Sequence, residues 1–186
     1  MKYKFLKYKF YLVTIILFLT AIGSLMKKEY HHMWNSIFIF FCYLVWIYIK
    51  NKGEIYVREY IEILVIITVL LHNVFGQYFN LYMTTEWFDK ALHVFGTFSF
   101  ALFFYSIIDI ITNISDKPKM FTFIIISSIG ISSAAILESV EFILDTIFKV
   151  KNQHGLTDIN LDLIFNLIGG VLAGVFGAFA KNEPLI

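Results

Sequence analysis

The sequence predicts an all-α integral membrane protein, a compact bundle of about six transmembrane helices. Of its 186 residues, 59% are hydrophobic and 19% are aromatic, and the mean hydropathy is +0.73. An ordinary soluble domain has only about 45–50% apolar residues. In this chain, apolar segments long enough to cross a bilayer alternate with short polar breaks. These observations point to the lipid bilayer as the surroundings of the protein and give no sign of a nucleic-acid-binding surface.

Six spans follow one another, at about residues 10–26, 34–49, 60–80, 91–114, 120–145 and 160–180. The first span follows the basic start "MKYKFLKYKF" and could pass for a signal peptide. We expect it to be retained, because its apolar run continues to Met26 and five further spans follow.

Short polar breaks delimit the remaining spans. The second follows "KKEYHH", the third follows "KNKGEIYVRE" and the fourth follows "TTEWFDK". Pro118 precedes the fifth, where it interrupts no helix. The sixth follows "KVKNQHGLTD" and carries small residues four apart, such as Gly170 and Gly174, which permit close helix contact. Such short connections predict antiparallel neighbours in a single domain over residues 1–186.

The distribution of basic residues predicts the orientation. If the N-terminus is cytoplasmic, 10 of the 15 Lys and Arg residues fall on the inner side and 5 on the outer side. Inner loops of membrane proteins carry an excess of Lys and Arg. We therefore expect a multi-pass protein of the bacterial cytoplasmic membrane with both termini in the cytoplasm.

The segment "ILESVEFILD" places three carboxylates in the apolar fifth span. Glu138, Glu141 and Asp145 are three and four residues apart, so a helix would bring them onto one stripe. An acidic side chain at a helix centre costs about 2.5–3.5 kcal/mol on insertion scales and usually marks a functional site. Glu138 and Glu141, together with Asp162 of the sixth span, are therefore the most informative acids.

Two further polar stripes start at the same predicted outer level. The sixth span carries Asp158, Asp162 and Asn166 at spacings of four, and the fourth pairs Asp89 with His93 at i, i+4. The third span ends there and brings His72 into range. We therefore expect helices four, five and six to contribute His93, Glu141 and Asp162 to one outward-facing polar pocket.

The surplus of acids at this level predicts a bound cation or shared protons. Seven acids would face three lysines at this level. The repulsion among the remaining carboxylates must be relieved by protonation or by a shared cation. Carboxylates with one imidazole suit Mg²⁺ or Mn²⁺, or Zn²⁺ if His93 binds directly. A proton-sharing carboxylate cluster and a purely structural network are the alternatives. The candidate ligands are Asp89, His93, Glu141, Asp158 and Asp162.

The segments "FDKALHVFG", "ESVEF" and "TDINLDLIFNLIGG" resemble, in order and spacing, the YjdF-like inner-membrane proteins of bacteria. They are more loosely similar to VanZ-like proteins, which are named for a role in teicoplanin resistance. The resemblance covers roughly residues 60 to 180 and implies a membrane protein without an established reaction. It implies the same site residues: Asp89, His93, Glu138, Glu141, Asp158 and Asp162.

Three classes of function fit these patterns. The first is a metal-assisted hydrolase or transferase that acts on a lipid or lipid-linked envelope precursor, with Glu138 and Glu141 as catalytic residues. The second is an ion- or proton-coupled transporter, although Asp109 lies 16 residues beyond His93, roughly 24 Å along a helix, which argues against a continuous relay. The third is a structural or partner-binding protein whose acids only fix helix register.

Overall fold

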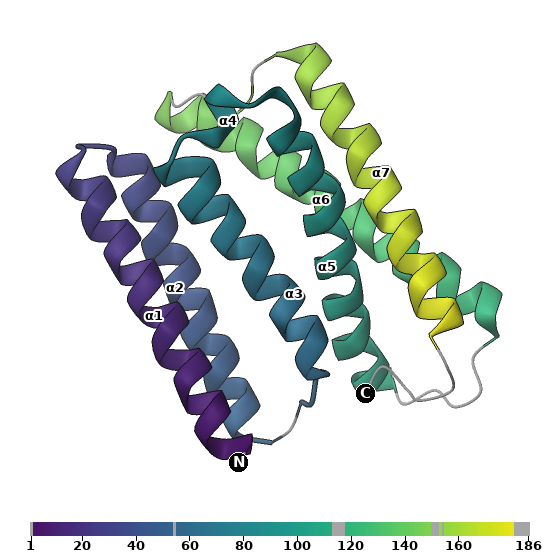
Figure 1. Ribbon diagram of the computed structural model, residues 1–186. Coiled ribbons are helices and arrows are strands. Elements are labelled where there is room, and N and C mark those ends of the chain that lie inside the picture. The colour runs from purple at the N-terminus through teal and green to yellow at the C-terminus, as the bar shows by residue number, and fades with distance from the viewer. Residues whose placement is uncertain (1, 54, 113–117, 150–152, 154, 181–186) are drawn as a thin grey trace. The chain divides into compact units, whose positions relative to one another are not determined.

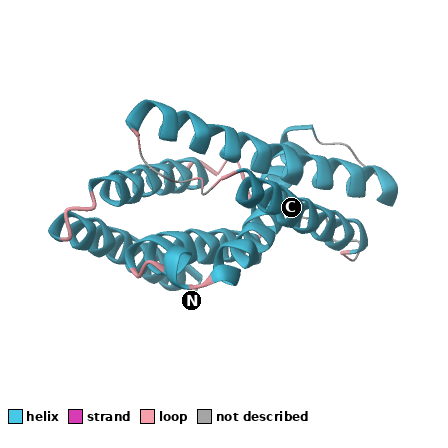
Figure 2. Cartoon of the chain, turned by 90° about the horizontal axis from the view of Figure 1, so that it is seen from above, coloured by secondary structure: helices cyan, strands magenta, loops and turns pink. Residues whose placement is uncertain are grey.

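Every regular element in the described part of the chain is a helix, as predicted. The computed structural model describes residues 2–53, 55–112, 118–149, 153 and 155–180 (Figure 1). Figure 2, coloured by secondary structure, shows helices joined by short loops. The elements are α1 (Lys2–Met26), α2 (Tyr30–Asn51), α3 (Glu59–Leu70), the π-helix η1 (Leu71–Tyr78), α4 (Leu81–Thr84), α5 (Glu86–Thr112), α6 (Lys119–Phe148) and α7 (Leu156–Phe179).

Five of the helical segments are long and apolar enough to cross a membrane. They are α2, the continuous α3–η1 segment, α5, α6 and α7, and α1 adds the shorter apolar stretch Phe10–Met26. The fourth predicted span begins at Glu86, earlier than expected, because Glu86 and Asp89 lie in its first turn, where acids favour a helix N-terminus. Residues 113 and 114 of that predicted span lie outside the described residues.

The chain divides into two compact units. Unit 1 comprises residues 1–54 and 69–85, and unit 2 comprises residues 55–68 and 86–186. Each unit is described by itself below. The expectation that all six spans form one domain stays a prediction.

Unit 1 packs α1 and α2 against each other and against the π-helix η1. Ser36 of α2 pairs with the fully buried Asn73 of η1 at 3.0 Å. The Lys27 ammonium donates to the Tyr78 carbonyl at 2.7 Å and lies 3.9 Å from the centre of the Tyr78 ring. The π-helix was not predicted, since its wider hydrogen-bonding pattern leaves no periodic signature in eight residues.

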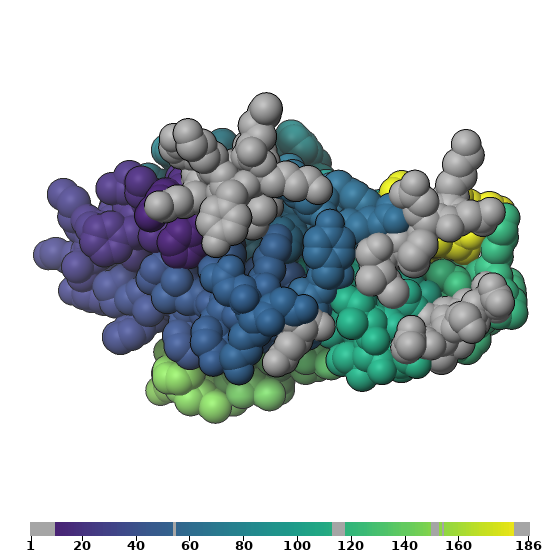
Figure 3. All heavy atoms as spheres, turned by 90° about the horizontal axis from the view of Figure 1, so that it is seen from below, coloured from purple at the N-terminus to yellow at the C-terminus, as the bar shows by residue number. Residues whose placement is uncertain are grey.

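Unit 2 is built around α5, α6 and α7, each of which contacts the other two. The small residues of α7 allow this close approach, because a Cβ on Gly170 or Gly174 would press on the α6 backbone carbonyls of Ser127 and Phe123. The predicted small-residue face is thus confirmed. The Lys119 ammonium of α6 lies 5.2 Å from the centre of the Phe179 ring of α7. Figure 3 shows the side of the molecule on which α6 begins and α7 ends.

Candidate functional site

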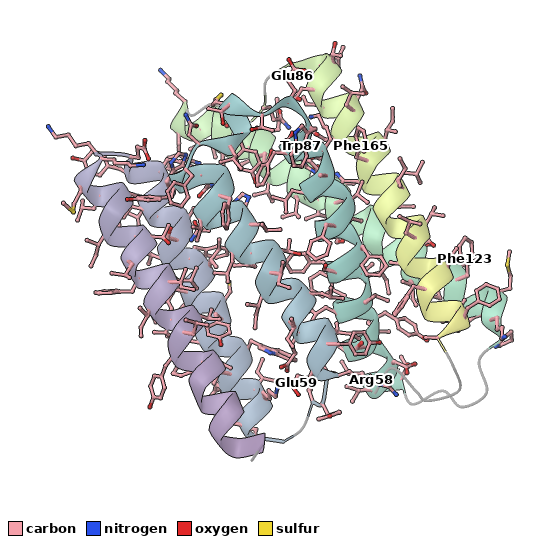
Figure 4. All side chains as sticks on the ribbon, viewed as in Figure 1. Arg58, Glu59, Glu86, Trp87, Phe123 and Phe165 are labelled. Carbon is pink, nitrogen blue, oxygen red and sulfur yellow. The ribbon has the colours of Figure 1, made fainter. Side chains whose placement is uncertain are left out.

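One group of charged side chains in unit 2 lies where α5 and α7 begin and α6 approaches its end. Figure 4 labels Glu86 and Trp87 at this end of α5, whereas Arg58 and Glu59 lie at the other end of the unit. We call this group the acidic cluster. It consists of Asp89, Lys90 and His93 from α5, Glu138 from α6, and Asp158 and Asp162 from α7.

Lys90 lies among three carboxylates. Its ammonium donates to Asp89 Oδ2 at 2.8 Å, to Asp158 Oδ1 at 2.6 Å and to Asp162 Oδ1 at 2.5 Å. The Lys90 side chain is 14% exposed and that of Asp162 only 7%. Charge-assisted contacts of this length are strong when they are withdrawn from water. Lys90 therefore links the first turns of α5 to those of α7.

His93 is surrounded by carboxylates on both ring nitrogens. Its Nε2 atom lies 3.3 Å from Asp89 Oδ1 and 3.4 Å from Asp162 Oδ1. Its Nδ1 atom lies 3.9 Å from Glu138 Oε1. The i, i+4 pairing of Asp89 with His93 was expected from the sequence, and the structure adds an acid from each of the two neighbouring helices.

Asn166 orients the His93 ring. Its side-chain oxygen accepts a hydrogen bond from Thr97 Oγ1 at 2.7 Å and faces His93 Nδ1 at 3.1 Å. An amide oxygen accepts hydrogen bonds and never donates them. His93 must therefore donate to this oxygen, and its Nδ1 atom carries a proton. The nitrogen left to face Asp89 and Asp162 is Nε2. A carbonyl oxygen that fixes the tautomer in this way is the usual support of a metal-binding histidine.

Three side chains of the cluster have the spacing of a metal site. Asp89, His93 and Asp162 each offer one ligand atom, and these atoms lie within 4.8 Å of one another among the described residues. Two carboxylates and one imidazole are a donor set that Mn²⁺ or Zn²⁺ accepts, and Mg²⁺ would rely on the carboxylates. Asp158, also predicted as a ligand, is not part of this group of three, although it contacts Lys90 as Asp89 and Asp162 do.

The three acids of the α6 stripe have different surroundings. Glu138 is 7% exposed and faces His93. Glu141 is only partly buried and makes no ion pair or hydrogen bond with the described residues. Asp145 accepts a hydrogen bond from the Gln153 backbone N–H at 2.9 Å, and the Gln153 side chain donates to the Glu138 carbonyl at 3.1 Å. Glu138, rather than the expected Glu141, therefore provides the α6 carboxylate nearest to His93.

His72 belongs to unit 1 and has partners there. Its Nδ1 atom lies 2.5 Å from the Tyr82 hydroxyl, and its Nε2 atom lies 3.0 Å from Asn35 Nδ2. The expectation that His72 joins the outer acids stays a prediction.

Two features of the site were missed at the level of sequence. Lys90 is one of the three lysines in the charge count above, and its position directly after Asp89 is the signal that it belongs to the same turn of helix. Gly169 had no assigned role. A Cβ at Gly169 would meet the Val94 carbonyl and lie 3.1 Å from Thr97 Cβ, so this glycine lets α7 approach α5 beside Asn166 and His93.

Comparison with known proteins gives a family but no reaction. The chain is 37% identical over 106 residues to an uncharacterised protein of Thermotoga maritima, an alignment that covers 55% of this chain and 53% of that protein. The chain thus spans about half the length of this relative. No solved structure matches. The narrower likeness to YjdF-like proteins stays a prediction. Residues 8–183 match the family described as "Predicted membrane protein (DUF2238)", and the chain therefore belongs to this family of membrane proteins.

Proposed function

We propose that the protein is a membrane-embedded, metal-assisted hydrolase or transferase that acts on a lipid or lipid-linked precursor of the cell envelope. The observation that carries this proposal is the convergence of Asp89, His93 and Asp162, whose ligand atoms lie within 4.8 Å of one another on helices apolar enough to cross a membrane. Ionisable groups at such positions are costly, and function usually explains why they are retained.

The charge balance supports a divalent cation at this position. Four carboxylates, those of Asp89, Glu138, Asp158 and Asp162, face the two basic side chains of Lys90 and His93. If His93 is a neutral ligand, the cluster has three more negative charges than positive ones. A divalent ion held by Asp89, His93 and Asp162 would offset two of the four carboxylate charges and would supply Lewis-acid polarisation of a phosphoryl or carbonyl oxygen.

Glu138 is the group best situated for proton transfer. It is buried on α6 and faces His93 without entering the group of three candidate ligands. A carboxylate in that situation suits a general base that activates water or a substrate hydroxyl. Glu141 lies three residues further along α6, and we retain it as a second candidate. Asn166 and Thr97 would hold His93 Nε2 toward the reacting centre.

The surroundings of the cluster support a substrate with an apolar tail. Next to Asp162 and Asn166, the α7 side chains of Leu163, Ile164 and Leu167 are exposed. These residues would face lipid in a membrane, so a lipid substrate would meet the cluster from within the bilayer. With both termini in the cytoplasm, as the basic residues favour, the cluster would open toward the outer surface.

A structural role is the second candidate, and one observation favours it. Lys90 makes three close contacts that tie α5 to α7, which a helix clamp would also require. Ion- or proton-coupled transport is a third possibility carried over from the sequence. Metal content distinguishes a metal-dependent enzyme from a structural protein, because Lys90 alone can link α5 to α7 without a bound metal ion.

Elemental analysis of the detergent-solubilised protein tests the proposal. We expect close to one Zn²⁺ or Mn²⁺ per chain in the wild type and loss of that metal in Asp162→Asn and His93→Gln. Asp145→Asn is the matched control, because Asp145 holds the Gln153 backbone. A wild-type protein that contains no metal, and that binds none when Mn²⁺ or Zn²⁺ is added, would overturn the metal-assisted reading.

A further inference from the structure

Lys90 competes for the atoms that a metal ion would need. The Lys90 ammonium lies 2.5 Å from Asp162 Oδ1, and the same oxygen lies 3.4 Å from His93 Nε2. Lys90 also contacts the second carboxylate of the candidate metal group, at Asp89 Oδ2. An ammonium and a divalent ion on one carboxylate oxygen would repel each other strongly in a partly buried site. Each cation therefore destabilises the other at this oxygen.

We propose that Lys90 is the resident cation of the site and that it withdraws when a divalent ion binds, which makes it a determinant of cation selectivity. This inference rests on the proposed function and adds to it an explanation of which cations can bind to Asp89, His93 and Asp162. A monovalent ion would bring no more charge than the ammonium that it displaces. Lys90 is also tethered beside its carboxylates, so it competes at a high effective concentration. A divalent ion that replaces the ammonium brings one more positive charge to the carboxylates, and this gain favours the exchange.

The position of Lys90 allows this exchange. It is the fifth residue of α5, near the end of the span, and its side chain is already 14% exposed. A lysine at such a position can extend its four-carbon stem and place the ammonium in water. The metal group would then keep Asp89, His93 and Asp162, while Asp158 would lose its short contact with Lys90.

The first test measures binding of Mn²⁺ to the purified protein in detergent. We expect Lys90→Gln to bind Mn²⁺ about tenfold more tightly than the wild type or better, because a positive charge beside the ion is removed. We also expect Na⁺ to compete with Mn²⁺ in Lys90→Gln and not in the wild type. Lys119→Gln is the matched control, since Lys119 lies at the other end of α6 beside Phe179. Unchanged or weaker Mn²⁺ binding by Lys90→Gln would overturn the inference.

The second test uses the wild-type chain and so does not depend on the folding of a variant. Acetylation of lysines by a water-soluble reagent is measured by mass spectrometry with and without Mn²⁺. We expect Lys90 to react several-fold faster when Mn²⁺ is bound, and Lys119 to be unaffected. Bound Mn²⁺ with no change in Lys90 reactivity would contradict the exchange and leave the metal site intact. Absence of both Mn²⁺ and Zn²⁺ binding in the wild type and in Lys90→Gln would instead overturn the proposed function, and the exchange with it.

Discussion

The side-chain oxygen of Asn166 lies 3.1 Å from His93 Nδ1 and determines which nitrogen of the ring faces the acids. Because that oxygen also accepts from Thr97, the Nδ1 atom must donate, and Nε2 is left for Asp89 and Asp162. The neutral form of this histidine is thus prepared to bind a cation through Nε2.

This arrangement makes Asn166→Leu an informative variant. We expect its affinity for Mn²⁺ or Zn²⁺ to fall about 10- to 100-fold, because supporting residues of metal sites typically have effects of that size. Loss of the acceptor for Thr97 should also lower the free energy of unfolding by about 1–3 kcal/mol. Metal titration and thermal melting would measure the two effects. Asn160→Leu is the control on the same helix, since Asn160 is exposed.

The three contacts of Lys90 predict a strong effect on stability in metal-free buffer. Lys90→Gln should lower the free energy of unfolding by about 3 kcal/mol, because it leaves partly buried carboxylates without their cation. A double-mutant cycle with Asp158→Asn should show coupling, so that the double variant is more stable than the sum of the single effects predicts. Additive effects in a denaturation series would show that Lys90 and Asp158 do not interact as the 2.6 Å distance indicates.

Gly169 should tolerate no side chain. In Gly169→Ala the new Cβ would press on the Val94 backbone and on Thr97, which would force α5 and α7 apart beside His93. Overpacking of this kind typically costs about 1–3 kcal/mol, and metal affinity should fall with it. Gly96→Ala is the milder control, because its Cβ would meet only a Thr68 side-chain methyl group at 3.2 Å and no backbone atom. Equal melting temperatures for the two variants would contradict this account.

Much of the fold could be predicted because apolar runs and polar breaks are local features of the sequence. The helices and the small-residue face of α7 follow from composition and from spacings of three and four. The π-helix η1 and the short helix α4 did not follow from these patterns, since eight and four residues are too few to show a period. The division into two units depends on packing between distant segments, and no single stretch of sequence reveals it.

The site was predictable as a set of stripes, but the contacts within it were not. Helical spacing placed Asp89 with His93 and Asp162 with Asn166. It could not decide between Glu138 and Glu141, because three residues on a helix leave a difference of about 60° in direction, and the rotation of α6 depends on its packing. In the structure it is Glu138 that faces His93. The role of Lys90 likewise depends on the approach of α7 to the first turn of α5.

The orientation of the chain gives a prediction that is independent of the site. With Cys42 replaced by Ala, a single cysteine at position 50 should react only with reagents that reach the cytoplasmic side. A cysteine at position 149 should react from outside. The two-to-one excess of basic residues on the inner side is the physical reason. Labelling of position 50 from outside intact cells would reverse the topology and place the acidic cluster at the inner surface.

The two glutamates of α6 provide the strictest test of the catalytic reading. We expect Glu138→Gln and Glu141→Gln each to abolish complementation of a deletion phenotype while the protein stays folded and inserted. Glutamine keeps the shape and hydrogen bonding of the side chain but removes one negative charge from an acidic cluster. The melting temperature should therefore hold or rise, because repulsion among like charges is relieved.

A purely structural cluster would behave in the opposite way. In that case glutamine should largely substitute for Glu138, and alanine should lower the free energy of unfolding by about 1–3 kcal/mol by leaving a buried partner unsatisfied. Asp145→Asn serves as the control, since its loss should weaken the hold on Gln153 without removing activity. Loss of activity in Glu138→Gln alone would assign the reaction to the carboxylate that faces His93 and exclude Glu141. Full complementation by both glutamine variants would rule out a catalytic role for either residue.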